Sequence, residues 1–128
     1  MKKQKMVLYC RASSHDQLIL QEERLRCYTE ENSGEVIGVV FDRRTGKHTK
    51  RLKLQWALHL ARKHNAMLVV ADLSRISRRV SESIKFANQL KRRGVDLVSV
   101  SNRNAEDQTG YMLTTGYLLK QVIAHSKT

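Results

Sequence analysis

The fold is decided by residues 6–10, Met-Val-Leu-Tyr-Cys, a run of apolar side chains that lacks the polar alternation of a half-exposed strand. Three comparable runs follow along the chain, at residues 36–41, 66–71 and 95–100. Because none of the runs has a polar face, each predicts a strand that is covered on both faces, as strands of a parallel sheet are.

Helical periodicity fills the intervals between these strands. Apolar residues recur at helical spacing along residues 17–31, 51–63 and 80–93, and Gly94 stands where a helix C-cap glycine belongs. The order predicts an α/β fold, a mostly parallel sheet of four to five strands with helices on both faces. Residues 111–125 predict a C-terminal helix, whose apolar stripe either docks onto the sheet or contacts a second copy of the chain.

Length and charge bound the possible partners. The 128 residues fit one domain, and 24 Lys and Arg against 12 Asp and Glu give a formal net charge of +12. Such an excess favours a polyanionic partner, with nucleic acid first and an anionic membrane surface second. No apolar run could span a bilayer. Cys10 and Cys27 fit no disulfide or zinc pattern, which favours packed, reduced thiols in a cytoplasmic protein.

The loops that follow the predicted strands carry the candidate chemistry, since ligands of parallel α/β sheets bind at the carboxyl ends of the strands. The first loop holds Arg11, Ser13 and Ser14. The later loops add Arg43, Arg44, Lys47, His48, Lys50, Arg51, Arg75, Arg78 and Arg79. Fixed guanidinium groups stabilise phosphoryl transfer, and a serine among them can act as a nucleophile. The alternative is that Ser13 caps the following helix.

Four blocks of sequence stand in a characteristic order. They are Tyr9-Cys10-Arg11-Ala12-Ser13-Ser14 with Gln17 and Gln21, Phe41-Asp42 with Gly46 and Arg51, Leu73-Ser74-Arg75-Ile76-Ser77-Arg78, and Gly94-Val95-Asp96-Leu97. Their order and spacing resemble the resolvase/invertase family of serine site-specific recombinases over essentially the whole chain. The resemblance implies a resolvase-like catalytic domain over residues 1–110. Residues 111–128 would begin a dimerisation helix, and we expect no DNA-reading domain within these 128 residues.

The resemblance also implies a mechanism for DNA strand cleavage and rejoining. Ser13 would attack a phosphodiester and hold the 5′-phosphate as a phosphoserine ester, with Ser14 in the position of the family's accompanying serine or threonine. The arginines expected to contact the phosphate are Arg11, Arg75, Arg78 and, as a further contributor, Arg51. Gln17 would help to order the site, and Asp42 would orient an arginine. The DNA-binding residues expected in the basic loops are Arg43, Arg44, Lys47, Lys50 and Arg79.

Double-stranded DNA is therefore the expected partner, in recombination or integration of the kind that transposons and phages carry out. Family members act as homodimers that pair into a tetramer on two DNA sites. The resemblance implies neither a metal nor another cofactor, and no membrane partner.

One departure from the family pattern bears on activity. Ser74 stands where the family carries an aspartate before the first arginine of the third block. Loss of that carboxylate should slow catalysis if it moves a proton or holds an arginine, and Asp72, two residues earlier, is a candidate substitute. The departure keeps open a catalytically weak or inactive DNA-binding or regulatory module. A basic α/β RNA-binding protein is a third possibility, which the 5% aromatic content disfavours.

Overall fold

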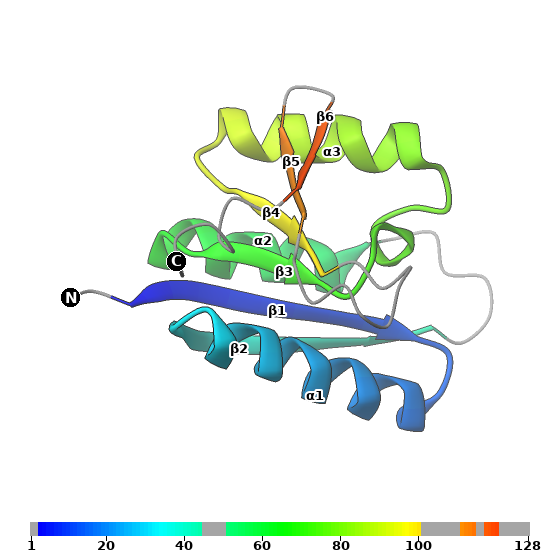
Figure 1. The fold of residues 1–128 in the computed structure, drawn as a ribbon. Coiled ribbons are helices and arrows are strands. Elements are labelled where there is room, and N and C mark those ends of the chain that lie inside the picture. The colour runs from blue at the N-terminus through cyan, green and yellow to red at the C-terminus, as the bar shows by residue number, and fades with distance from the viewer. Residues whose placement is uncertain (1–2, 45–50, 101–110, 115–116, 121–128) are drawn as a thin grey trace.

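The computed structural model describes residues 3–44, 51–100, 111–114 and 117–120. Its sheet has the order β2-β1-β3-β4-β5-β6, and the first four of these strands run parallel. The parallel strands are β1 (Gln4–Ala12), β2 (Gly34–Arg43), β3 (Met67–Val70) and β4 (Leu97–Ser99). The helices that connect them are α1 (His15–Glu31), α2 (Leu52–His64) and α3 (Val80–Arg92), with a short 3-10 helix, η1 (Leu73–Arg75), after β3 (Figure 1).

The predicted α/β order is confirmed, and each of the three expected helices begins and ends within two residues of its predicted bounds. Gly94 follows α3 with a φ of 84°, a left-handed conformation that glycine adopts without steric cost, so the predicted C-terminal glycine is also confirmed. None of the helices among the described residues is long and apolar enough to cross a membrane.

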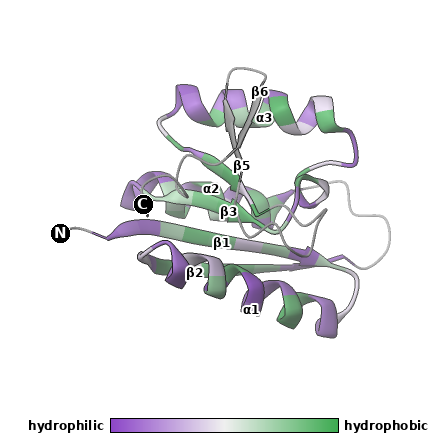
Figure 2. Ribbon diagram, viewed as in Figure 1, coloured by the Kyte–Doolittle hydropathy of each residue, from purple (hydrophilic) through white to green (hydrophobic). Residues whose placement is uncertain are grey.

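The core lies on both faces of the sheet because side chains alternate along the central strand β1. Val7 and Tyr9 pack with residues of α2 and α3 on one face, whereas Met6, Leu8 and Cys10 pack with residues of α1 on the other. Figure 2 shows hydrophobic colour along the middle of β1, whereas hydrophilic and hydrophobic residues alternate along the helices. Burial on both faces, predicted for residues 6–10, is confirmed, since all five are fully buried.

The same prediction is wrong for residues 36–41. Strand β2 lies at one edge of the sheet, and Val40 is its one fully buried residue, while Phe41 remains 38% exposed. An edge strand has a neighbour on one side alone, so helices at the centre of the sheet overlap it incompletely. Its apolar run therefore packs only in part.

The prediction of a C-terminal helix over residues 111–125 is wrong where the structure describes the chain. Two short strands stand there, β5 (Tyr111–Thr114) and β6 (Tyr117–Lys120), which extend the sheet antiparallel to β4 and to each other. Each has three apolar or aromatic residues followed by a polar one, a pattern that periodicity cannot separate from a helix segment. Pairing with β4 decides between them, so the sheet has six strands, and residues 111–114 and 117–120 are strand rather than helix.

We predict that Gly34→Ala destabilises the fold. An added Cβ at Gly34 would lie 2.9 Å from both Met6 Cε and Thr29 Cγ2 and 3.1 Å from the carbonyl oxygen of Gln4. The overlap should lower the free energy of unfolding by about 1–3 kcal/mol, measured by urea denaturation. Gly38→Ala is the matched control on the same strand, because its Cβ would meet only Leu60 Cδ1 at 3.5 Å. Equal stability of the two variants would contradict the packing described at Gly34.

We also predict that the two cysteines react very differently with thiol reagents. Burial raises the pKa of Cys10 to about 12, with Glu22 as a smaller contributor, while Cys27 is exposed on α1. At pH 8 the reactive thiolate of Cys10 should therefore be scarce as well as inaccessible. Ellman's reagent should modify one thiol per native chain and two after unfolding in guanidinium chloride. Rapid modification of both thiols in the native protein would contradict the burial of Cys10.

Candidate functional site

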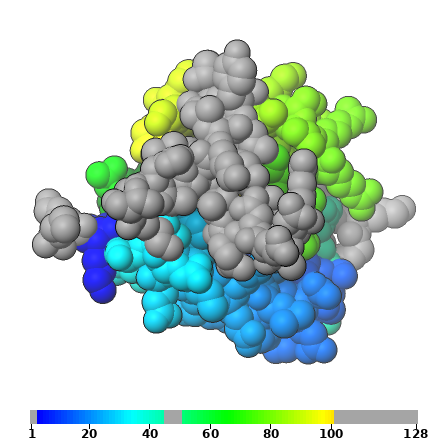
Figure 3. Space-filling view, viewed as in Figure 1, coloured from blue at the N-terminus to red at the C-terminus, as the bar shows by residue number. Residues whose placement is uncertain are grey.

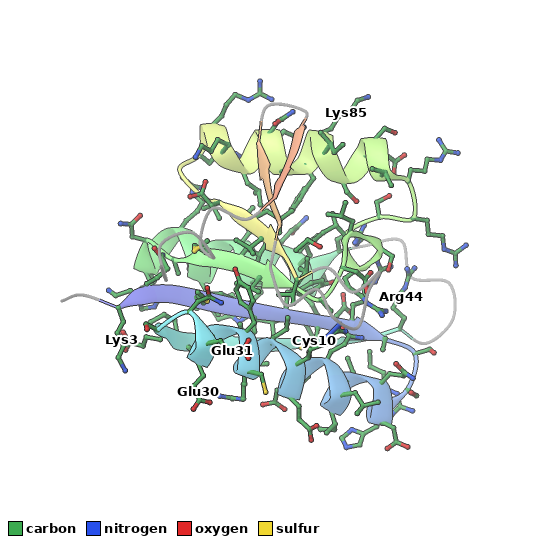
Figure 4. All side chains as sticks on the ribbon, in the orientation of Figure 1. Lys3, Cys10, Glu30, Glu31, Arg44 and Lys85 are labelled. Carbon is green, nitrogen blue, oxygen red and sulfur yellow. The ribbon has the colours of Figure 1, made fainter. Side chains whose placement is uncertain are left out.

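The carboxyl ends of the parallel strands meet at one edge of the sheet, where the first turns of α1 and α3 also lie (Figures 1 and 3). Arg44 lies at this edge, whereas Lys3, Glu30 and Glu31 lie at the opposite end of the molecule (Figure 4). The two glutamates that end α1 are therefore far from the basic loops. The acidic residue that α1 brings to the carboxyl edge is Asp16, in its first turn.

Gln21 fixes the backbone of Arg11 at this edge. Strand β3 pairs with β1 no further than Tyr9, two residues short of Arg11. The buried Gln21 side chain replaces the missing strand: its Oε1 accepts from the Arg11 N–H at 3.0 Å, and its Nε2 donates to the Arg11 carbonyl at 2.9 Å. Both backbone groups of Arg11 are thereby satisfied although β3 no longer pairs with β1 there, and β2 continues beside β1 on the other side.

Two predicted phosphate-binding arginines hold each other through backbone carbonyls. Arg11 Nη1 donates to the Arg75 carbonyl at 3.2 Å, and Arg75 Nη1 donates to the Arg11 carbonyl at 3.0 Å. Arg51, which precedes α2, reaches the same turn, where its Nη2 donates to the Ile76 carbonyl. The structure thus brings together guanidinium groups from three distant parts of the chain, as predicted.

Tyr9 links this arginine cluster to Asp42. The Tyr9 hydroxyl donates to Asp42 Oδ2 at 2.6 Å. Burial, followed by the hydrogen bond and charge of Asp42, raises the pKa of Tyr9 well above its ordinary value, and the nearby Arg51 guanidinium opposes the rise only in part. The hydroxyl therefore stays protonated and keeps donating to Asp42. Among the described residues, Asp42 makes no ion pair with an arginine, so its contact with the cluster runs through Tyr9.

Asp72 organises the turn that follows β3. Its side chain caps η1, where Oδ1 accepts from the Ser74 N–H at 3.0 Å and also from the Ser74 hydroxyl. Its other oxygen, Oδ2, lies 3.3 Å from Arg75 Nε. Asp72 thus contacts Ser74, the residue that differs from the family pattern, and Arg75, the arginine that follows it.

The two candidate serines have different roles. Ser14 is the N-cap of α1, and its hydroxyl accepts from the Gln17 N–H at 3.3 Å. The alternative in which Ser13 caps this helix is therefore wrong, because the adjacent residue does so. Ser13 is exposed, and its hydroxyl has no hydrogen-bond partner among the described residues. Ser13 thus remains available for chemistry at the end of β1.

The other predicted residues lie around this cluster without joining its hydrogen bonds. Arg78 is exposed and makes no hydrogen bond or ion pair with any residue that the structure describes, and the Gln17 side chain is also exposed. Arg79 pairs with Glu82 at 3.8 Å. Arg43 is exposed at the end of β2, and the Arg44 N–H donates to the Ala12 carbonyl at 2.8 Å. Lys47 and Lys50 lie outside the described residues.

Within the described part of the chain, no three His, Cys, Asp or Glu side chains come close enough to hold a metal ion. An open groove of about 360 Å³ lies between α2 and α3, with Arg51 and Ser77 at the side of the arginine cluster and Leu58 and Phe86 among its apolar lining residues.

The sequence prediction missed two residues that shape the site, Gln21 and Tyr9. Both stand in the first of the four sequence blocks, where Tyr9 is the aromatic residue and Gln21 is the second glutamine. The prediction assigned the ordering role to Gln17, but the hydrogen bonds to Arg11 come from Gln21, one helical turn later. Gln21 lies at helical spacing between Leu18 and Leu25, on the buried face of α1, and this is the signal that could have identified it.

We predict that Gln21→Ala lowers the free energy of unfolding by about 1–3 kcal/mol, because it leaves the buried Arg11 N–H unpaired. Urea denaturation measures the loss. Gln17→Ala is the control from the preceding turn, and it should stay within about 0.5 kcal/mol of the wild type because its side chain is exposed. A Gln21→Ala protein as stable as the Gln17→Ala protein would contradict the anchoring role.

Comparison with known proteins agrees with this geometry. The family model for the resolvase N-terminal domain matches residues 6–124. The transposon Tn552 resolvase of Staphylococcus aureus is 32% identical over 117 residues, which cover 91% of this chain and 54% of that protein. The chain thus spans about half the length of this curated relative.

Solved structures give the same result. A resolvase family site-specific recombinase from Streptococcus pneumoniae superposes with a TM-score of 0.65 and 25% identity, over 77% of this chain and 72% of that one. The C-terminal catalytic domain of IS1535 TnpA, an IS607-like serine recombinase, superposes with a TM-score of 0.59 and 30% identity, over 73% and 69% of the two chains. Because the resolvase N-terminal domain model matches nearly the whole chain, this chain belongs to the resolvase family.

Proposed function

We propose that this chain cleaves and rejoins DNA in site-specific recombination, through a covalent intermediate in which the 5′-phosphate is esterified to Ser13. The observation that carries the proposal is the convergence of Arg11, Arg51 and Arg75 on one turn, at the edge of the sheet where Ser13 is exposed. Ser14 is occupied as a helix cap, so Ser13 is the free hydroxyl of the pair.

Charge supports a phosphate as the ligand of this cluster. Three guanidinium groups reach carbonyls of the same two segments, while among the described residues only the carboxylate of Asp72 pairs directly with one of them. Like charges repel in such an arrangement, and an anion that sits between them relieves the repulsion. Guanidinium binds phosphate oxygens in pairs and stays charged at any physiological pH, which suits it to a transition state that carries extra negative charge.

The chemical step follows from this arrangement. Ser13 Oγ attacks the phosphorus of a DNA phosphodiester, a new O–P bond forms, and the bond from phosphorus to the 3′-oxygen breaks. The serine hydroxyl loses its proton, and the departing 3′-oxygen takes up a proton to become a hydroxyl. Rejoining is the reverse attack by a 3′-hydroxyl on the phosphoserine ester. The energy of the phosphodiester is retained in the ester, so no nucleotide cofactor is required.

The partner that we propose is double-stranded DNA, bound first through its phosphates. The exposed cations at the edge, Arg43, Arg78 and Arg79, would contribute salt-dependent affinity without reading sequence. Lys47 and Lys50 would add to the same basic surface. The working assembly would be a homodimer that pairs into a tetramer on two DNA sites.

A second candidate is a recombinase-like module that binds DNA but cleaves it weakly or not at all. The observation that favours it is Ser74, which carries no negative charge in the place of the family's aspartate. The two candidates differ in whether a covalent protein–DNA adduct forms. DNA binding alone does not separate them.

We predict that Ser13→Ala abolishes the covalent adduct. The wild-type chain is incubated with nicked duplexes of randomised sequence, so that a cleaved strand cannot be rejoined, and adducts are resolved by denaturing gel electrophoresis. Mass spectrometry of the digested adduct should place a phosphodiester-linked nucleotide on Ser13. Ser13→Ala should give no adduct yet retain binding of the duplexes, because only the attacking oxygen is removed.

Ser14→Ala is the matched control. It removes the cap of α1, at a cost of about 1 kcal/mol in stability, and should still form the adduct. An adduct on Ser14, or one that persists in Ser13→Ala, would contradict the proposed nucleophile. DNA binding by the wild type with no adduct under any of these conditions would favour the second candidate.

A further inference from the structure

We propose that Asp72 is the positioning residue for Arg75, and that its carboxylate does from two residues earlier what an aspartate at position 74 would do. The proposal rests on the proposed function, since its consequence is the rate at which Ser13 attacks. In this proposed role Asp72 contacts neither Ser13 nor the phosphate. It acts through the arginine.

Two groups hold the Arg75 side chain in place, the Arg11 carbonyl and the Asp72 carboxylate. Its Nη1 donates to the Arg11 carbonyl at 3.0 Å, which fixes one end of the guanidinium. Its Nε is buried, and its nearest acidic atom is Asp72 Oδ2 at 3.3 Å. No hydrogen bond reaches this Nε among the described residues, so the carboxylate charge is what compensates it. Without Asp72, a buried positive donor would face no counter-charge.

The Asp72 side chain is itself held in place. Its Oδ1 accepts from both the backbone N–H and the hydroxyl of Ser74, so the carboxylate is fixed on the turn that carries Arg75. The side chains of Arg75 and Asp72 are 29% and 35% exposed, which places their ion pair partly out of water. Such a pair is screened less than one on the open surface. Ser74 thus orients the carboxylate instead of supplying one.

These contacts leave one nitrogen of the Arg75 guanidinium, Nη2, free for a ligand. With Nη1 on Arg11 and Nε against Asp72, Arg75 keeps its Nη2 donors, which no described residue occupies. The guanidinium is therefore oriented before a phosphate arrives, with donors in reserve. Orientation of this kind lowers the barrier because little reorganisation remains at the moment of reaction. A carboxylate at position 72 or at position 74 would serve equally if it reached Nε.

The test compares Asp72→Asn with the double variant Asp72→Asn/Ser74→Asp, using the nicked randomised duplexes. Asparagine caps a helix as well as aspartate does, so the single change keeps the turn and removes the charge. We expect adduct formation to slow by about 10- to 100-fold in Asp72→Asn, with duplex affinity changed less than about threefold. The double variant should recover most of the lost rate, because it returns the carboxylate at the neighbouring position.

Ser74→Ala is the control that keeps the Asp72 charge and removes only its orienting hydroxyl. Its rate should fall less than that of Asp72→Asn. Wild-type cleavage rates in Asp72→Asn would overturn the proposal, as would a double variant that stays as slow as the single one. A merely structural role for Asp72 is rejected by rescue from position 74, since Asp72→Asn already keeps the cap oxygen and Ser74→Asp returns the charge.

A second measurement judges the inference independently of cleavage. The ¹H–¹⁵N heteronuclear NOE of the Arg75 Nε–H reports its motion on the picosecond to nanosecond scale. We expect an ordered signal in the wild type, a lowered NOE in Asp72→Asn and recovery in the double variant. An unchanged NOE in Asp72→Asn would overturn the positioning role even if the wild type formed no adduct. Absence of the wild-type adduct would count against the proposed function alone.

Discussion

The arrangement of this site depends on the exchange of hydrogen bonds between Arg11 and Arg75, each of which donates to the other's backbone carbonyl. Two groups of like charge would separate in solution. Here the carbonyl oxygens, which carry partial negative charge, hold them together, and Arg51 joins through the carbonyl of Ile76. The end of β1 and the turn after β3 are therefore locked by the same contacts that assemble the cations.

That lock explains why small changes in the surrounding elements bear on the site. β1 extends past its neighbour β3, so without the amide of Gln21 the backbone of Arg11 would lack a partner on that side of the strand. Tyr9, buried two residues earlier, ties Asp42 of the edge strand β2 to the neighbourhood of Arg51. The site is thus built from backbone and side-chain hydrogen bonds that all converge on one strand end.

The sequence predicted most of this framework because the relevant signals are local. Apolar runs and helical spacing located β1, β3 and α1 to α3, and parallel strands necessarily bring the loops with Arg11 and Arg75 to one edge. The exposed state of β2 was not predictable from its apolar run, since it depends on which strand lies at the edge. The strands β5 and β6 were missed because pairing with β4, a nonlocal interaction, decides between helix and strand for runs of four residues.

The details of the site escaped prediction for a related reason. The helical spacing places Gln21 on the buried face of α1, but the need for its amide beside Arg11 arises because β3 ends early, and that point is set by the length of a distant strand. Likewise, Ser74 alone indicates a lost carboxylate, whereas the turn brings Asp72 Oδ2 to within 3.3 Å of Arg75 Nε. A carboxylate at either of two nearby sequence positions can occupy the same place in the structure, because a 3-10 turn brings residues two and three apart close together. In a cluster of arginines, the position of a charge in space decides how the cations are held, and its position in the motif does not.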